Sequence, residues 1–171
     1  MILLIDNYDS FTYILFQYLL KWDKVKVIKN DEPIPDISTF SSVVISPGPG
    51  LPSTSGHLMS YLPKFIGKIP VLGVCLGHQA IAEYYGARLE RAKEIFHGRV
   101  SEIVHDQKGI FKGLPSPFFA NRYHSWVISH SHLPEDLEVT AFTKDEVIMG
   151  IVSKKDKNVH GVQFHPESIL T

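Results

Sequence analysis

Residues 71–79 read Val-Leu-Gly-Val-Cys-Leu-Gly-His-Gln, a short apolar run that ends at a cysteine between two glycines. The run predicts a buried β-strand, and a helix is expected to follow it from about Gly77 to Tyr85. Gly73 and Gly77 stand two residues before and two residues after Cys75, so the strand and the helix can cross closely without a Cβ clash. A strand that turns sharply into a helix is typical of the elbow that exposes a nucleophilic side chain.

The first half of the chain alternates short apolar runs with segments long enough for helices. The runs predict strands at residues 2–5, 25–28, 43–46 and 71–75. Fully apolar strands in such an alternation indicate a parallel sheet that is covered on both faces. Ligands of open α/β sheets bind beyond the carboxyl ends of the strands, where Asp6, residues 46–50 and Cys75 are expected.

The second half has a different pattern, in which short segments of mixed or alternating polarity are separated by turn signals. The segments at residues 99–104, 137–142, 149–152 and 159–164 predict an antiparallel extension of the sheet. No internal repeat or low-complexity linker interrupts the chain. We therefore expect one domain over residues 1–171 with an α/β fold, in which an open, mostly parallel sheet is flanked by helices and extended by antiparallel strands.

The first predicted helix carries apolar residues on more than one face. Those at helical spacing are Phe11, Ile14, Leu15, Tyr18, Leu19 and Trp22, and the stripe is widened by Phe16 and Leu20. Either Asp9 or Ser10 can cap the N-terminus of this helix. We expect the helix to be buried between the sheet and its neighbours, and contact with another protein is the alternative.

Composition and charge exclude several classes of protein. The 171 residues include 17 basic and 18 acidic side chains, so the net charge is −1 and no basic excess exists to bind nucleic acid. The first residues predict a strand rather than a signal peptide, and no apolar run approaches the ~18 residues that a membrane span needs. The single cysteine excludes an internal disulfide. We expect a cytoplasmic protein that binds neither nucleic acid nor a membrane.

The residue types at the strand ends are those of a cysteine nucleophile with its base. The partial positive charge at a helix N-terminus would favour a thiolate at Cys75, and a buried structural cysteine is the alternative. His165-Pro-Glu167 supplies a base and a carboxylate that could orient it. Because proline disfavours helix at the preceding residue, we expect an extended chain here, in which His165 and Glu167 face the same side.

Two further segments could complete a pocket. Residues 46–52, Ser-Pro-Gly-Pro-Gly-Leu-Pro, combine a constrained backbone with free N–H groups, which suits an oxyanion, and an ordinary rigid loop is the alternative. Residues 121–126 bring several polar side chains to a strand end. The nine histidines show no metal-ligand spacing, so we expect no metal, and the glycine fingerprint of a dinucleotide site is also missing.

Taken together, these motifs resemble the class I (triad) glutamine amidotransferases over almost the whole chain. The stretches that carry the resemblance are residues 5–13, 46–50, 72–79, 105–115, 122–125 and 160–168. The opening Asp-Asn-Tyr-Asp-Ser-Phe is similar to the chorismate-using branch, the small subunits of anthranilate synthase and of aminodeoxychorismate (para-aminobenzoate) synthase. The resemblance implies a flavodoxin-like fold, L-glutamine as substrate, and no metal or organic cofactor. It also implies a hetero-oligomer with a larger synthase subunit, which aminates chorismate with the ammonia released.

The resemblance further implies a role for each residue that matches the motifs of the family. Cys75 would be the nucleophile, His165 its base and Glu167 the group that orients His165, and glutamine would be hydrolysed through a glutamyl thioester. The implied substrate-binding groups are the backbone N–H groups of Gly48-Pro49-Gly50 and Leu76, which would hold the oxyanion, and Gln79, Ser125 and Trp126, which would contact glutamine.

The sequence departs from the family pattern at three places. Trp126 stands where the family usually has leucine, which would change a wall of the pocket but keep a main-chain contact. Ile14 replaces a common asparagine, which would change packing rather than chemistry. Relatives continue beyond Thr171 into a further helix, so less helical cover is expected here.

Two other functions remain open on the sequence. One is a stand-alone γ-glutamyl hydrolase of the same fold, and the other is a non-catalytic binding subunit. The presence of Cys75, His165 and Glu167 argues against the second, because a subunit that has lost catalysis usually lacks its nucleophile or its base. The sequence does not distinguish tryptophan synthesis from folate synthesis, since the two synthases can share one small subunit.

Overall fold

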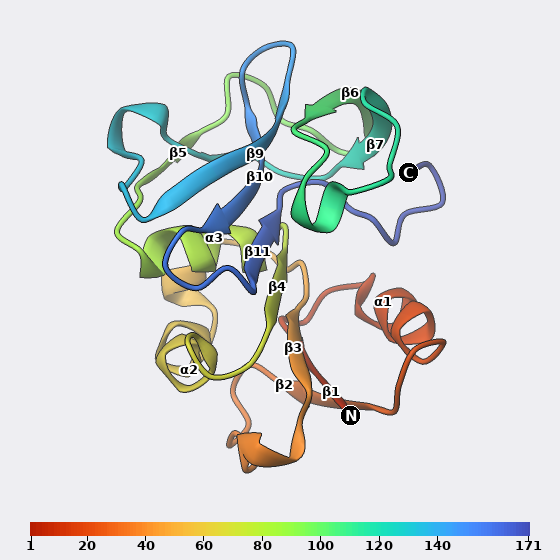
Figure 1. The fold of residues 1–171 in the computed structure, drawn as a ribbon, viewed down its shortest axis with the longest axis vertical. Helices are drawn as coiled ribbons and strands as arrows, with labels where there is room; N and C mark the ends of the chain where they lie inside the picture. Colours follow the sequence, from red (N-terminus) through yellow and green to blue (C-terminus); the bar gives the residue numbers. More distant parts are fainter.

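A nine-stranded mixed sheet forms the centre of the protein, and the computed structural model describes residues 1–171 (Figure 1). The strand order is β2-β1-β3-β4-β11-β10-β9-β6-β7. The strands are β1 (Ile2–Asp6), β2 (Val25–Lys29), β3 (Ser42–Ile45), β4 (Val71–Val74), β6 (Arg99–His105), β7 (Phe118–Arg122), β9 (Leu137–Thr143), β10 (Ile148–Ser153) and β11 (Val159–Val162). A separate antiparallel pair consists of β5 (Leu89–Arg91) and β8 (Trp126–Ile128). The α-helices are α1 (Thr12–Leu19), α2 (Leu58–Phe65) and α3 (Leu76–Tyr84), and short 3-10 helices lie at Ile37–Thr39, Pro52–Thr54, Gly109–Phe111 and His130–His132.

The sheet changes from parallel to antiparallel in the middle. Strands β2, β1, β3, β4 and β11 are parallel neighbours, and β10, β9, β6 and β7 add antiparallel pairs. This confirms the predicted α/β fold with its antiparallel extension. The prediction for residues 159–164 was wrong in detail, because β11 lies in the parallel half beside β4. Val159 and Val162 of β11 are buried in the cores on opposite faces of the sheet, as in the other central strands.

Helices cover both faces of the parallel half, which explains why the strands β3 and β4 at its centre and residues 2–5 of β1 are almost entirely apolar. On β1, Leu3 and Ile5 pack into the core beneath α2 and α3, whereas Ile2 and Leu4 pack into a second core with Leu15 of α1. Figure 1 shows α2 and α3 on one side of the sheet and α1 on the other. Alternate side chains of a strand point to opposite faces, so a strand buried on both faces has no polar position.

The sequence did not predict α2, β5, β7 and β8. In α2 the helical pattern is interrupted by Pro63, and β5 and β8 have three residues each, too few for a period to show. None of the helices has the length and apolarity that crossing a lipid bilayer requires.

The expected burial of the first helix was wrong for most of its surface. Helix α1 has eight residues, of which only Thr12 and Leu15 are buried, and Trp22 beyond its end is 85% exposed. Its N-cap is Phe11, without a side-chain cap, although the Asp9 carboxylate accepts the Phe11 N–H at 2.7 Å. No second helix packs beside α1 on this face, so its outer aromatic residues remain in solvent. Contact with another protein, the alternative interpretation, stays open.

Candidate active site

Cys75 lies at the turn between β4 and α3, in a backbone conformation that side chains rarely adopt. Its φ is 52° and its ψ is −99°, and its side chain is only 4% exposed. A non-glycine residue with positive φ persists only where the surrounding structure holds it, and such residues cluster at functional sites. A Cβ atom on Gly73 would lie 2.3 Å from the carbonyl carbon of Gly77, and one on Gly77 would lie 2.6 Å from the Ile45 oxygen. The flanking glycines therefore allow the predicted close crossing of strand and helix.

Replacing Gly73 by alanine should destabilise the protein strongly, because the new methyl group would meet backbone atoms that cannot rotate away. Overpacking of a dense interior typically costs 1–3 kcal/mol, and we expect a loss of about 3 kcal/mol in the free energy of unfolding. Urea denaturation followed by circular dichroism measures this loss.

Gly86→Ala is the matched control for this substitution. Gly86 has a φ of +96° but no atom within 4 Å of an added Cβ, so its variant reports only the cost of the backbone conformation. That cost is about 1 kcal/mol. If Gly73→Ala were no more destabilising than Gly86→Ala, the crossing of β4 and α3 would accommodate a methyl group. Our explanation of the flanking glycines would then be wrong.

His165 and Glu167 form a buried pair next to the cysteine. The Nδ1 atom of His165 lies 2.6 Å from Oε1 of Glu167, and their side chains are 2% and 0% exposed. The predicted contact is present, but the expected extended chain is not, because Pro166 and Glu167 lie in a turn closed by a hydrogen bond from the Ser168 N–H to the His165 carbonyl. The turn, rather than the alternation of a strand, brings the carboxylate under the imidazole.

The surroundings of His165 favour its charged form. Burial alone would lower the pKa of this imidazole, but hydrogen bonds and charge from Cys75 and Glu167 outweigh it and raise the pKa to about 10. The second ring nitrogen, Nε2, is buried and makes no hydrogen bond of regular geometry. The thiol that influences it is therefore the group with which His165 can exchange a proton.

The pair predicts a pH-dependent stability. The pKa of His165 is about 10 in the folded protein and about 6.5 in an unfolded chain. The protonated imidazole therefore contributes fully to the free energy of unfolding below pH 6.5, and this contribution is lost as the pH rises toward 10. Glu167→Gln removes one group that raises this pKa. We expect the variant to be less stable by about 2 kcal/mol at pH 6, the value of a hydrogen bond to a charged group, and by much less at pH 9.5.

Urea denaturation of both proteins at the two pH values tests this expectation. Glu32→Gln is a suitable control, because Glu32 is an exposed carboxylate far along the chain from the pair. A stability difference for Glu167→Gln that does not change with pH would show that the carboxylate acts without a charged His165.

The predicted oxyanion groups lie on adjacent segments. A Cβ atom on Gly48 would lie 2.8 Å from the Leu76 side chain and 2.6 Å from Cβ of Asn7, so the loop after β3 packs directly against the start of α3. Neither Gly48 nor Gly50 donates a backbone hydrogen bond within the protein. Leu76 is the first residue of α3, and its N–H has no acceptor within the helix. Pro49 and Gly50 are exposed.

The predicted glutamine-binding residues have different surroundings. The Nε2 atom of Gln79 donates to the Trp126 carbonyl at 3.0 Å, so two of these residues contact each other. The expected main-chain contact of Trp126 with glutamine stays a prediction. The Trp126 ring instead packs on the guanidinium of Arg91, 4.4 Å from the ring centre. Ser125 is half-buried, and its carbonyl accepts the Ala92 N–H at 2.9 Å.

Three residues of the site were not singled out from the sequence. Gln163 is fully buried and donates from Nε2 to the Cys75 sulfur at 3.5 Å. The Tyr123 carbonyl lies 3.9 Å from the same sulfur, and the rings of Tyr123 and Phe11 pack on the His165 ring, with centroids 5.1 and 5.6 Å away. All three lie inside the motifs that carry the family resemblance, but no spacing rule indicated that they meet.

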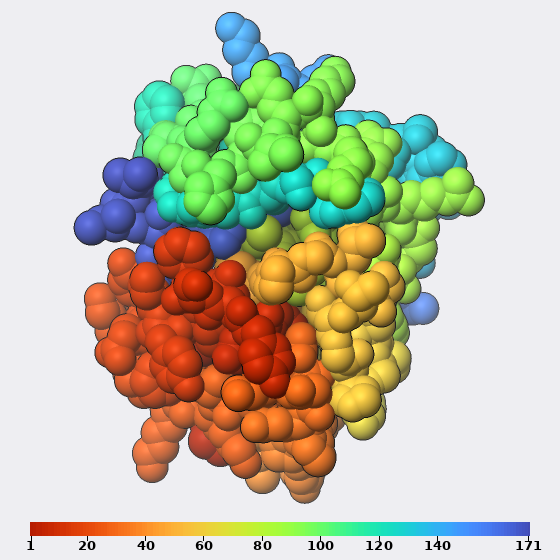
Figure 2. Space-filling model, turned by 180° about the vertical axis from the view of Figure 1, so that it is seen from behind, coloured from red at the N-terminus to blue at the C-terminus, as the bar shows by residue number.

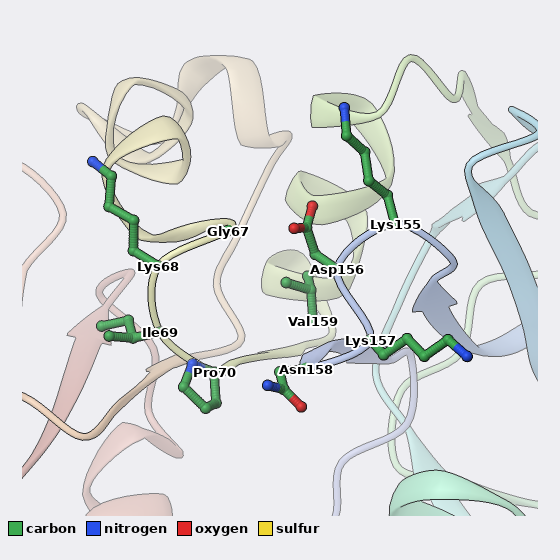
Figure 3. A pocket seen from close by; sticks show the side chains of 9 residues that line it. All are labelled: Gly67, Lys68, Ile69, Pro70, Lys155, Asp156, Lys157, Asn158 and Val159. Atoms are coloured by element: carbon green, nitrogen blue, oxygen red, sulfur yellow. The ribbon is translucent and has the colours of Figure 1, made fainter.

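The site residues come from both halves of the chain. Figure 2 shows the face on which the N-terminal third, in red and orange, meets the green and cyan segments of the second half. The hollow in Figure 3 lies elsewhere: it has a volume of about 260 Å³ and is lined by residues 67–70 and 155–159, where the chain enters β4 and β11. Cys75 follows the other end of β4, and Lys68 and Lys157 extend away from each other in Figure 3 rather than converging on a ligand.

No three His, Cys, Asp or Glu side chains are grouped so that they could hold a metal ion.

Comparisons with known proteins agree with this architecture. The chain matches the family described as glutamine amidotransferase class-I over residues 3–171. Anthranilate synthase component 2 of Cyanophora paradoxa is 49% identical, with 100% of this chain and 92% of the relative covered. Aminodeoxychorismate/anthranilate synthase component 2 of Bacillus subtilis is 47% identical, with 100% and 90% covered. A glutamine amidotransferase of Thermotoga maritima has the same fold, with a TM-score of 0.77 at 20% identity over 97% of this chain and 75% of that one.

An α/β sheet with a cysteine at a strand–helix elbow is typical of a class of enzymes that act through a nucleophilic thiol. Within that class, the family match and the identities over the whole chain are decisive. The protein belongs to the class I glutamine amidotransferases.

Proposed function

We propose that this protein hydrolyses L-glutamine to glutamate and ammonia and supplies the ammonia to a larger synthase subunit that aminates chorismate. The observation that carries the proposal is the strained Cys75 elbow beside the buried pair of His165 and Glu167. The family description, glutamine amidotransferase class-I, supports the substrate, and the component 2 in the names of the relatives supports the existence of a partner component. Residues 1–171 act as one glutamine amidotransferase domain, in the cytoplasm, where the single thiol stays reduced.

The reaction begins from a Cys75 thiolate beside a charged His165, the ion pair that forms when the thiol gives its proton to Nε2 of His165. The sulfur attacks the side-chain amide carbon of glutamine, and the carbonyl oxygen becomes an oxyanion that the N–H groups of Leu76 and the 48–50 loop stabilise. His165 then gives its proton to the amide nitrogen, the C–N bond breaks, and ammonia leaves. Glu167 holds the imidazole in position and stabilises its charged form during these steps.

Hydrolysis of the thioester completes the cycle. His165 removes a proton from a water molecule, the hydroxide attacks the thioester carbonyl, and the C–S bond breaks to release glutamate. The Cys75 thiolate that leaves lies beside the charged His165, which restores the starting state. In both steps Gln79, Ser125 and Trp126 bind the glutamine, and Trp126 does so through its main chain.

Glutamate release from glutamine, measured for the purified chain alone and with each candidate synthase subunit, tests the proposed function. We expect release that increases with at least one partner, and the partner that increases it identifies the pathway. Release from longer γ-glutamyl substrates without any partner would favour a stand-alone hydrolase instead. No release under any pairing would favour a binding subunit, and labelling by a reactive glutamine analogue would then fail as well.

A further inference from the structure

Gln163 lies against the atom that performs the chemistry. It follows β11 directly, its side chain is fully buried, and its Nε2 atom is 3.5 Å from the sulfur of Cys75. A buried amide that faces a sulfur costs free energy unless it contributes a hydrogen bond there. The side chain therefore has a specific orientation rather than filling space.

The orientation of this amide is set by Gln79. The Oε1 atom of Gln163 accepts a hydrogen bond from Nε2 of Gln79 at 3.0 Å, and of the two ends of a side-chain amide only the oxygen can accept. The other end of the Gln163 amide, with its two N–H donors, must then face Cys75. The second N–H of Gln79 is fixed by the Trp126 carbonyl at 3.0 Å, so neither amide can flip without losing a bond.

We propose that Gln163 is a catalytic residue that stabilises the thiolate of Cys75 by donating a hydrogen bond to it, and that Gln79 positions Gln163. The inference rests on the proposed function and adds a residue to its site. A hydrogen bond to a charged acceptor is worth more than one to a neutral acceptor, so the donor favours the thiolate over the thiol. The Gln163 donor counteracts the effect of the Tyr123 carbonyl, which lies 3.9 Å from the sulfur and favours the protonated thiol.

The connection also couples glutamine binding to the nucleophile. Gln79 is one of the residues proposed to bind glutamine, and it is one hydrogen bond removed from the donor on the sulfur. Its Oε1 atom accepts no hydrogen bond within the protein, so this atom is free to bind an N–H group of the substrate. A substrate that holds Gln79 in place therefore also holds Gln163 on the thiolate.

Gln163→Met tests the donor, because methionine has a similar length and no N–H group, and Gln79 keeps its bond to Trp126. The readout is the rate at which iodoacetamide alkylates Cys75, the only cysteine, as a function of pH without glutamine. We expect alkylation at pH 7 to fall about 10-fold or more, the effect of losing a charge-assisted hydrogen bond, with recovery at high pH. The value of kcat for glutamine hydrolysis should fall by a similar factor, and KM should change little.

Other groups near the thiol also influence its profile and are kept constant in this experiment. They are His165, Glu167 acting through His165, and Asp9, whose charge interacts with His165. Gln79→Leu gives the second arm: it leaves the Gln163 donor in place but frees the amide to rotate, so alkylation should slow several-fold without substrate present.

Two results would overturn the inference. One is an alkylation profile for folded Gln163→Met that coincides with that of the wild type. The other is a slower rate for Gln163→Met that persists unchanged at high pH, which indicates distorted packing rather than a lost donor. If Gln163→Met does not fold, Gln163→Glu is used, and an unchanged profile for that variant would refute the donor role as well. Failure of glutamine hydrolysis in the wild type would contradict the proposed function but leave the alkylation test valid.

Discussion

Replacing Cys75 by serine should reduce glutamine hydrolysis at least ~10³-fold, because a hydroxyl oxygen is a far weaker nucleophile than a thiolate in a site arranged for sulfur. The measurement is glutamate release in the presence of the synthase subunit that activates the wild type most. The loss should appear in kcat, since Cys75 bonds to the substrate only after glutamine has bound.

The fold should survive this substitution, which makes the result easy to interpret. Serine is slightly smaller than cysteine, and the positive φ at this position is imposed by the crossing of β4 and α3 rather than by the sulfur. Urea denaturation of Cys75→Ser should therefore agree with the wild type to within about 1 kcal/mol. Because the chain has one cysteine, alkylation should fall from one label per chain to none. Retention of a tenth of the activity would exclude the thiol as nucleophile.

Local patterns in the sequence were sufficient to predict the strand, turn and helix around Cys75. Gly73 and Gly77 are needed there because they lack a Cβ atom, and this property is evident from the residue type alone. The apolar runs of β1, β3 and β4 likewise reflect burial on both faces, which is a property of each strand by itself. The order of the strands was harder to predict from the sequence. Strand β11 was assigned to the wrong part of the sheet because its four residues include a histidine and a glycine.

Contacts between distant segments could not be derived in this way. Gln163 and Cys75 are 88 residues apart, and their meeting depends on the pairing of β11 with β4. The exposure of α1 has the same origin, since its apolar residues are typical of a buried helix and only the absence of a neighbouring helix leaves them in solvent. The alternation expected at His165 and Glu167 predicted the right contact for the wrong reason, because a turn produces it.

His165→Ala should be comparable to Cys75→Ser in its effect on activity, about 10³-fold, because the thiol loses the base to which it transfers its proton. Unlike serine at position 75, however, alanine here should also destabilise the protein. The Glu167 side chain is completely buried and would lose its partner, and breaking a buried pair by removing one member costs about 3–5 kcal/mol.

The double variant His165→Ala/Glu167→Gln separates the two effects. Glutamine carries no charge, so the second substitution should restore much of the lost stability while activity stays at the low level of the single variant. Urea denaturation and glutamate release on the four proteins of this cycle measure both quantities. If activity returned together with stability, His165 would be a structural residue and another group would have to serve as the base. If the double variant remained as unstable as His165→Ala, the loss of stability would come from the missing imidazole and not from a carboxylate left without its partner.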